Sequence, residues 1–509
     1  MELIWNGIVS TWSWLMEHLL YVNLLLSIAI IFFQRRDPKT VWTWLLALNF
    51  IPVFGILFYL LFGQNLKKSR MFRVKEVGDR LQLPVKSQEE IIRSDDMPEE
   101  QMDPLSRDFK SLILYNLETS GSVLTVNNQV QVFTDGRAKF EALRQELRSA
   151  RHFIHIQYYI IKNDELFDSI VPILLEKVKE GVEVRILCDG MGGRFMPARR
   201  WEQMRAAGIK VGVFFPPFCW LNLRVNYRNH RKIVVVDGCV GFVGGFNIGK
   251  EYISKDPKFG YWRDTHLKIF GEAAISLQIR FALDWNYATG ENLFKDMRYF
   301  GEEAECARRQ LAKDAAPLWP DPGEASELVC MQIITSGPDT REPHIRNNYL
   351  ELFHKAKHNI YIQTPYFIPD DAILSALKMA ALSGVDVRLM IPCKPDHPFV
   401  YWATCSYAGE LLDYGARVYI YENGFLHSKG IMVDGRVSCY GTANMDIRSF
   451  ELNFEVNATI YDGDVTGELE EAFINDLPHC RELTKEDYRK RNLWMRVKEQ
   501  SSRLLSPLL

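Results

Sequence analysis

The chain of 509 residues lacks several features that mark whole classes of protein. Its 61 lysines and arginines are balanced by 64 aspartates and glutamates, so no basic excess favours nucleic acid as a partner. Its nine cysteines include no C-x-x-C pair, which argues against both a disulfide framework and a structural zinc site. No cluster of His, Cys and Asp has the spacing of metal ligands, and we therefore expect neither a metal ion nor another cofactor.

Long uncharged runs are confined to the region near the N-terminus. Residues 41–63 carry no charge and are long enough to cross a bilayer, and residues 19–33 reach that length if the helix extends back toward Ile8. The second residue is Glu2, and no small-residue cleavage site precedes the second run, which argues against a cleaved signal peptide. The sequence therefore predicts a retained anchor of two transmembrane helices over residues 1–66.

The cations beside these runs leave the membrane topology open. They are Arg35, Arg36 and Lys39 between the runs, and Lys67, Lys68, Arg70, Arg73 and Lys75 after the second run. Two full crossings cannot place both groups in the cytoplasm. The larger group favours a cytoplasmic catalytic region, whereas Pro52 and Gly55 permit a re-entrant hairpin that keeps both groups on the same side.

The rest of the chain contains an internal repeat. HFIHIQYYIIKND from His152 is matched by HNIYIQTPYFIPD from His358, and GVEVRILCDG from Gly181 is matched by GVDVRLMIPC from Gly384. Each copy alternates short β-branched runs with helical stretches in the order strand, helix, strand, helix, strand. We therefore predict an α/β fold with two similar halves, residues 121–316 and 324–485, after a polar linker over residues 67–120.

Each half ends in the same motif, H-x-K-x-x-x-x-D, followed after a gap of six residues by G-x-x-N. The motif residues are His230, Lys232, Asp237 and Asn247 in the first half, and His427, Lys429, Asp434 and Asn444 in the second. Because residues two apart on a strand share a face, each histidine and its lysine are expected to project toward one site. A second copy at the equivalent place of the repeat makes a chance match negligible.

These residue types suit the cleavage of a phosphodiester. A diester under attack accumulates charge on its nonbridging oxygens, which lysines and amide donors stabilise without a metal. One imidazole can attack phosphorus while a second protonates the departing alkoxide. The remaining strand histidines have no such partners, and a structural role is expected for His152, His155, His354 and His358.

On these motifs the chain resembles the phospholipase D superfamily, whose hallmark is the duplicated H-x-K-x-x-x-x-D motif, over nearly everything after Val123. More narrowly, it is similar to the bacterial cardiolipin synthases in the strings RRDPKTVWTWLL, VNYRNHRKI, YWRDTH and SYAGELLDYGARVYIYENGFLHSK. The resemblance implies two phospholipase D-like halves related by a pseudo-twofold axis, with both motifs at one cleft. It also implies a multi-pass enzyme of the bacterial cytoplasmic membrane. Such an enzyme transfers a phosphatidyl group between two phosphatidylglycerols through a phosphatidyl-histidine intermediate, giving cardiolipin and glycerol.

The resemblance further implies roles for the motif residues. His230 is expected to be the nucleophile and His427 the general acid and later the base, with the reverse order open. The lysines and asparagines, Lys232, Lys429, Asn247 and Asn444, are expected to hold the phosphate. Asp237 and Asp434 each begin a DG turn and are expected to order the motif loops.

An imidazole that attacks or accepts a proton needs a carboxylate on its other nitrogen to fix the tautomer. The resemblance implies that Glu455 in SFELNFE orients His427, with Asp264 in YWRDTH as the matching candidate for His230. Surface ion pairs are the alternative for both acids.

Two apolar segments suggest how lipid reaches the site. FFPPFCW over residues 214–220 is a candidate wall that excludes water, with ordinary core as the alternative. Residues 486–509 are predicted to form an interfacial amphipathic helix on anionic lipid, with docking on the protein body as the alternative. Its apolar face is formed by Leu493, Trp494, Val497, Leu504 and Leu505, with Arg489, Lys490, Arg496 and Arg503 around it.

Three functions remain compatible with the motifs. The first is phosphatidyl transfer that makes cardiolipin from phosphatidylglycerol, with other anionic lipids as further partners. The second is a hydrolytic phospholipase D. The third, a phosphodiesterase or nuclease, is opposed by the apolar N-terminal runs and by the absence of a basic, aromatic surface segment. The oligomeric state cannot be predicted from these features.

Overall fold

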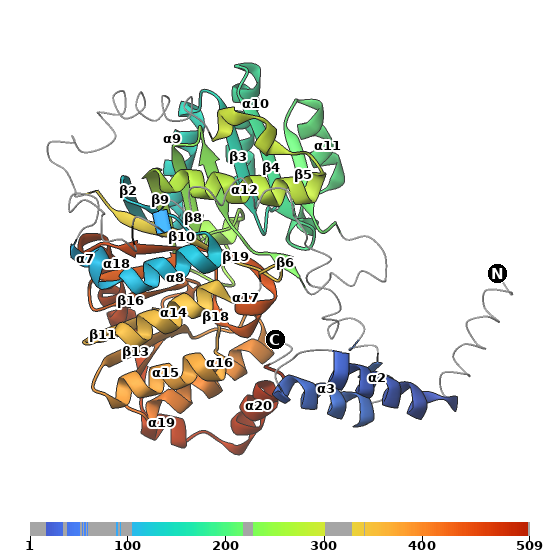
Figure 1. The fold of residues 1–509 in the computed structure, drawn as a ribbon, viewed down its shortest axis with the longest axis vertical. Coiled ribbons are helices and arrows are strands. Elements are labelled where there is room, and N and C mark those ends of the chain that lie inside the picture. Colours follow the sequence, from blue (N-terminus) through green and yellow to red (C-terminus); the bar gives the residue numbers. More distant parts are fainter. Residues whose placement is uncertain are drawn as a thin grey trace. The chain divides into compact units, whose positions relative to one another are not determined.

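The computed structural model describes residues 17–33, 38–50, 53, 55, 56, 59, 88, 89, 92, 104–216, 227–300, 328–340 and 342–506. The chain divides into two compact units, one that holds the N-terminal helices and one that holds the α/β body. The elements of both units are labelled in Figure 1.

The N-terminal unit contains two helices, α2 (Leu19–Phe33) and α3 (Pro38–Phe50), which pack against each other. Ile30, Trp44 and Leu48 are buried between them, and Asn23 Nδ2 donates a hydrogen bond of 2.8 Å to the carbonyl of Leu48. Within the described ranges, the structure contains no helix that is both long and apolar enough to span a membrane. The predicted span over residues 41–63 continues past Phe50 into a stretch of which only four positions are described.

The first half of the body is built on an eight-stranded mixed sheet with the order β15-β9-β8-β7-β3-β4-β5, in which β2 also pairs with β9 and β15 (Phe425–Leu426) comes from the second half. Its strands are β2 (Asn128–Asp135), β3 (Phe153–Tyr158), β4 (Glu183–Asp189), β5 (Lys210–Phe214), β7 (Ile233–Val236), β8 (Val240–Gly244) and β9 (Trp262–Gly271). Its helices are α9 (Gly136–Ser149), α10 (Glu165–Lys179), α11 (Ala198–Ala206) and α12 (Ala273–Thr289), with 3-10 turns at Gly192–Phe195, Lys250–Ile253, Leu293–Lys295 and Met297–Tyr299.

The second half repeats this plan on a ten-stranded sheet with the order β1-β10-β19-β17-β16-β11-β13-β14-β20, in which β1 is Leu124–Thr125 and β6 (Arg228–Asn229) also pairs with β19. Its strands are β10 (Cys330–Ser336), β11 (Asn359–Gln363), β13 (Asp386–Pro392), β14 (Arg417–Tyr421), β16 (Gly430–Val433), β17 (Val437–Gly441), β19 (Asn453–Tyr461) and β20 (Cys480–Leu483), with a separate pair β12 (Phe367–Ile368) and β18 (Met445–Asp446). Its helices are α14 (His344–Lys355), α15 (Asp371–Leu382), α16 (Pro398–Leu412), α17 (Ile447–Glu451), α18 (Gly463–Asp476), α19 (Lys485–Arg489) and α20 (Leu493–Leu504), with a 3-10 turn at Leu477–His479.

The duplicated α/β prediction is confirmed by this architecture. The order strand, helix, strand, helix, strand is β3-α10-β4-α11-β5 in the first half and β11-α15-β13-α16-β14 in the second. The predicted junction near residues 317–323 lies outside the described residues.

The two faces of the central strands differ in polarity because side chains alternate along a strand. In β3, Ile154 and Ile156 belong to an apolar core that also contains side chains of α9 and α10. His155 and Gln157 point to the other face, where their side chains hydrogen-bond to Gln278 and Asp284 of α12. Helix α12 therefore covers a polar layer, and Figure 1 shows it crossing the sheet of the first half.

The residues before the first half differ from the predicted linker over 67–120. Residues 104–120 form two helices, α7 (Pro104–Asp108) and α8 (Lys110–Ser120), and α8 packs on α14 and β10 of the second half. Leu112, Ile113 and Leu117 are fully buried on one helical stripe. Strand β1 (Leu124–Thr125) then pairs with β10, so this segment belongs structurally to the second half.

Candidate active site

The two motif histidines are placed by an exchange of short strands between the halves. Strand β6 (Arg228–Asn229) precedes His230 and pairs in parallel with β19 of the second half, and His230 N donates to the carbonyl of Phe454 at 3.0 Å. Strand β15 (Phe425–Leu426) precedes His427 and pairs in parallel with β9 of the first half, and His427 N donates to the carbonyl of Arg263 at 2.7 Å. Each histidine therefore lies beside the long strand of the opposite half.

This exchange decides which carboxylate faces which histidine. Nδ1 of His230 lies 3.0 Å from each carboxylate oxygen of Glu455, and Nδ1 of His427 lies 2.6 Å from Oδ2 of Asp264. The predicted pairing, Glu455 with His427 and Asp264 with His230, is wrong. Both acids do face a catalytic histidine, but each faces the histidine of the opposite half, because Asp264 lies on β9 and Glu455 on β19.

Both histidines are largely enclosed. The side chains of His230 and His427 are 13% and 10% exposed, whereas Glu455 and Asp264 are fully buried. Burial, together with the neighbouring Lys429, lowers the pKa of His427 to about 4 against the opposing effect of Asp264. Burial also lowers the pKa of His230, again against the effect of its carboxylate partner. Before a phosphate binds, both imidazoles are therefore neutral at pH 7, each with a carboxylate on Nδ1, and Lys429 Nζ lies 3.2 Å from Nε2 of His427.

The carboxylates are held ionised by these contacts. Burial alone would raise the pKa of Glu455, but the charge and hydrogen bond of His230, together with Lys232, hold it below its usual value. Lys429 and His427 have the same effect on the pKa of Asp264. Two ionised acids beneath two neutral imidazoles stabilise the positive charge that forms when either imidazole reacts.

The motif lysines lie next to their histidines, but the motif segments are not themselves strands: residues 230–232 lie between β6 and β7, and residues 427–429 lie between β15 and β16. Lys232 Nζ donates to the carbonyl of His230 at 2.6 Å, and Lys429 Nζ donates to that of His427 at 2.5 Å. Burial is the main cause that lowers the pKa of Lys232 to about 7 and that of Lys429 to about 8. Lys429 also contributes to the lowered pKa of His230, and Lys232 to that of His427, so the two motifs share one site.

The two motif asparagines are equivalent in sequence but differ in their contacts. Asn247 Oδ1 accepts a hydrogen bond from Ile160 N, and its Nδ2 donates to Tyr252 Oη at 2.9 Å, which leaves one amide hydrogen. The side-chain carbonyl of Asn444 is buried, and no described residue donates to it. Within the described residues, the side-chain carbonyl of Asn444 therefore lacks the hydrogen bond that the carbonyl of Asn247 accepts.

The motif aspartates lie away from the reacting groups. Asp237 accepts hydrogen bonds from the backbone amides of residues 151–153 at 2.7 to 2.8 Å, and Asp434 accepts from those of residues 357–359 at 2.7 to 2.9 Å. Both have positive φ angles, 52° and 55°, and each precedes a glycine that also has positive φ. They tie the turn after the motif strand to the start of β3 or β11, in agreement with the predicted loop-ordering contacts.

Further side chains, which no sequence motif identified, also support the site. Arg231 forms a bidentate ion pair with Asp284 at 2.7 and 2.8 Å, and its Nε donates to the carbonyl of Glu455. Asn453 Nδ2 donates to the Glu455 carboxylate at 3.2 Å. The adjacency of Arg231 to His230 was visible in the sequence, but no signal linked it to Asp284 on α12.

Aromatic rings surround the two imidazoles. Tyr159 lies edge-on to His230 with 5.1 Å between ring centroids, and Trp262 lies 5.1 Å from His427. Of the proposed wall FFPPFCW, Phe214 and Phe215 are buried, and both pack on Phe454, the neighbour of Glu455. Residues 217–220 of that segment, including Trp220, lie outside the described residues.

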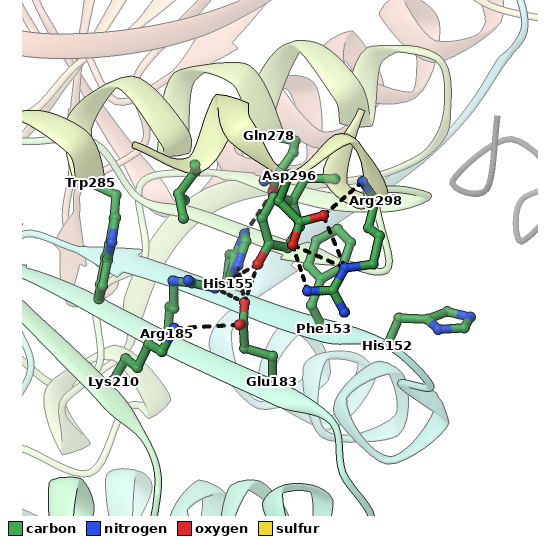
Figure 2. Close-up of polar contacts among 12 residues, drawn as sticks. His152, Phe153, His155, Glu183, Arg185, Lys210, Gln278, Trp285, Asp296 and Arg298 are labelled. Atoms are coloured by element: carbon green, nitrogen blue, oxygen red, sulfur yellow. Dashed lines mark hydrogen bonds and ion pairs between the residues drawn. The ribbon is translucent and has the colours of Figure 1, made fainter. Parts of the chain in front are cut away.

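His155 belongs to a separate buried network. Figure 2 shows its ring beside the Glu183–Arg185 pair, while His152 points away from the network. Its Nδ1 lies 3.0 Å from Gln278 Oε1, its ring stacks on Phe281, and burial lowers its pKa to about 3. These contacts are those of a core residue. Across the described ranges, no group of three or more His, Cys, Asp or Glu side chains could hold a metal ion.

Comparisons with known proteins agree with this geometry. The family model described as "Cardiolipin synthase, PLD-like domain" matches residues 143–258 and 349–477, and the model "Phospholipase_D-nuclease N-terminal" matches residues 22–64. The chain is similar to the major cardiolipin synthase of Bacillus subtilis, with 46% identity over 507 residues, 98% of this chain and 100% of that protein. It is also similar to the cardiolipin synthase of Oceanobacillus iheyensis, with 43% identity over 96% of this chain and 97% of that protein.

A solved structure shares the fold at low sequence identity. The phosphatidylserine synthase of Haemophilus influenzae superimposes with a TM-score of 0.57 and 15% identity, covering 80% of this chain and 98% of that one. The duplicated motifs, the fold and the sequence similarity over nearly the full chain lead to the same conclusion. The chain belongs to the cardiolipin synthase family of the phospholipase D superfamily.

Proposed function

We propose that this protein is a cardiolipin synthase that transfers a phosphatidyl group from one phosphatidylglycerol to another, releasing glycerol. The observation that carries the proposal is the pair of crossed His–carboxylate contacts, each with a lysine at its base, in one enclosed site. The names of the full-length relatives support the same substrate class.

In the first half-reaction, Nε2 of His230 attacks phosphorus, and the bond from phosphorus to the glycerol oxygen breaks. Glu455 on Nδ1 stabilises the positive charge on the ring as the phosphorus–nitrogen bond forms. His427, in its imidazolium form with Asp264 on Nδ1, delivers the proton on Nε2 to the departing glycerol oxygen, and the anionic phosphate of the bound lipid favours this charged form. Lys232 and Lys429, with the amides of Asn247 and Asn444, stabilise the charge on the nonbridging oxygens.

In the second half-reaction, His427 removes the proton from a hydroxyl of the second phosphatidylglycerol. That oxygen attacks phosphorus, the phosphorus–nitrogen bond breaks, and cardiolipin leaves with His230 restored. Asp264 holds Nδ1 of His427 throughout, so Nε2 can act as acid and then as base. Net transfer requires the lipid hydroxyl to reach phosphorus in place of water, and the enclosed histidines favour this outcome.

We also propose that the apolar N-terminal segment anchors the enzyme in the bacterial cytoplasmic membrane. Its catalytic body then faces the cytoplasm, the side that the larger cation group favours. Anchoring raises the encounter rate between the site and its lipid substrates.

The function is tested by incubating purified protein in vesicles with labelled phosphatidylglycerol alone. Cardiolipin and glycerol should form in equal amounts, and excess glycerol should drive cardiolipin back to phosphatidylglycerol, because the same phosphohistidine lies on both paths. Formation of phosphatidic acid and glycerol without cardiolipin, at every lipid density, would instead identify a hydrolase.

A further inference from the structure

The C-terminal helix α20 packs on the body through its polar side, whereas an ordinary amphipathic surface helix packs through its apolar side. A surface helix normally buries its apolar stripe and exposes its polar residues. In α20 the residues buried against the body are Glu499 and Ser502, each 2% exposed, followed by Ser506 at 3%. Except for the half-buried Met495, the apolar side chains of this helix lie on the outside.

Polar contacts hold α20 in this orientation. It packs along α16, as Figure 1 shows, and Arg503 Nη2 lies 2.5 Å from Glu410 of α16. The Arg503 guanidinium also covers the ring of Tyr407, and Arg491 pairs with the buried Glu499. Asn492 caps the helix by accepting a hydrogen bond from Met495 N. These partly buried pairs fix which side of α20 faces outward.

The outward side carries an apolar stripe, interrupted between Val497 and Leu504 by the exposed Gln500 and Ser501. Leu493 and Leu504 are each 77% exposed, Trp494 70% and Val497 42%. At about 100° per residue, Leu493, Val497 and Leu504 lie within about 40° of one another, and Trp494 extends the stripe on one side. Large apolar side chains gathered on one exposed helix face indicate a surface that is covered in use.

The charges around the stripe indicate what covers it. Residues 485–506 contain seven Lys and Arg but only three Asp and Glu, although the chain as a whole is slightly acidic. Arg496 and Lys498 are exposed on the two sides of the apolar stripe, and Arg489 and Lys490 precede the helix in exposed ion pairs that contribute little in water. An apolar stripe bordered by cations matches an anionic lipid surface, in which the side chains enter the acyl region and the cations meet the headgroups.

We propose that α20 is a second membrane contact, which lays the outer side of the second half on the anionic bilayer. This inference deepens the proposed function by adding a regulatory dependence on the lipid surface, and its physical readout does not require turnover. Burying one large apolar side chain strengthens membrane binding by on the order of tenfold or more.

The first test measures the environment of Trp494 in the full-length protein. The emission of the wild type minus that of Trp494→Phe isolates this one indole among the 12 tryptophans. In vesicles of phosphatidylglycerol and phosphatidylcholine, the difference emission should shift to the blue and should be quenched by brominated lipid but not by aqueous iodide. Quenching by iodide alone overturns the proposal. If neither quencher reaches Trp494, and this shielding grows with protein concentration, a second copy of the chain covers the stripe. That result also overturns the proposal.

The second test measures the consequence for activity. Leu493→Ser with Leu504→Ser should reduce turnover of vesicle phosphatidylglycerol by roughly tenfold or more, yet leave turnover of a monomeric short-chain phosphatidylglycerol unchanged. The matched control, Met297→Ser with Leu328→Ser, removes two apolar side chains that are 61% and 58% exposed elsewhere on the body. Equal loss on both substrates, or equal loss in the control, contradicts the role of α20. Failure of the proposed function itself would appear differently, as absence of cardiolipin in the wild type.

Discussion

Glu455→Gln should slow the attack of His230 on phosphorus and should leave the proton-transfer role of His427 largely intact. The substitution keeps the shape of the side chain but removes a negative charge whose two oxygens lie 3.0 Å from His230 Nδ1. A charge at such a distance raises the pKa of an imidazole by roughly 1–3 units, and each unit is worth about 1.4 kcal/mol. The positively charged phosphohistidine should lose that stabilisation, so the attack should slow by roughly tenfold to a thousandfold.

A substrate with a good leaving group isolates this step. On a nitrophenyl ester of phosphatidic acid, departure of nitrophenolate needs no acid, so a rapid-mixing burst reports the attack on phosphorus alone. Glu455→Gln should slow the burst by the same factor of roughly tenfold to a thousandfold. Asp264→Asn should leave the burst within about threefold of the wild type and slow turnover of phosphatidylglycerol by roughly 10²–10⁴-fold, because it disturbs only the acid.

The control and the refuting result are well defined. Glu451→Gln removes the same charge from an exposed position four residues upstream and should leave both rates unchanged. Thermal unfolding of each variant shows whether the body remains intact. A burst that is lost in Asp264→Asn and retained in Glu455→Gln would refute the reasoning that leads from the crossed contacts to the roles of the two histidines.

Three further predictions address charge, metal and the motif turns. Because burial lowers the pKa values of Lys232 and Lys429 to about 7 and about 8, both lysines are charged only below those values. Accordingly, kcat/KM for phosphatidylglycerol should fall as pH rises through 7 to 8, and a flat profile up to pH 9.5 would contradict this. Activity should survive EDTA, because the lysines and asparagines supply the positive potential at the phosphate. Loss of activity in EDTA that a specific divalent ion restores would contradict this prediction. Asp434→Ala removes three hydrogen bonds to backbone amides and should lower Tm by several degrees, with Asp434→Asn, which keeps an acceptor, less affected.

The sequence alone determined the chemistry and the plan of the fold. The motif spacing predicted that Lys232 and Lys429 lie beside their histidines, because extended backbone places residues two apart on one side, although the structure puts these residues between short strands and not within one. The repeat likewise predicted two α/β halves, because strand and helix periodicity are local signals.

Properties that depend on contacts between distant segments could not be predicted in the same way. The resemblance assigned Glu455 to His427 and Asp264 to His230, each acid to the histidine of its own half, and no local signal in the sequence shows the crossing. Only the insertion of β6 beside β19 and of β15 beside β9 brings each acid to the histidine of the other half. Helix α8 was assigned to a linker for a similar reason, since its short apolar stripe gains a partner only when β10 and α14 fold beneath it.

The orientation of α20 shows the same division between sequence and tertiary structure. Its amphipathic pattern was evident from Leu493, Trp494 and Val497, but two placements of that pattern were possible. The structure decided between them through Glu410 and Glu499, whose partners Arg503 and Arg491 hold the polar side inward. The periodicity of a helix defines its faces, whereas the ion pairs available on its neighbour determine which face is buried.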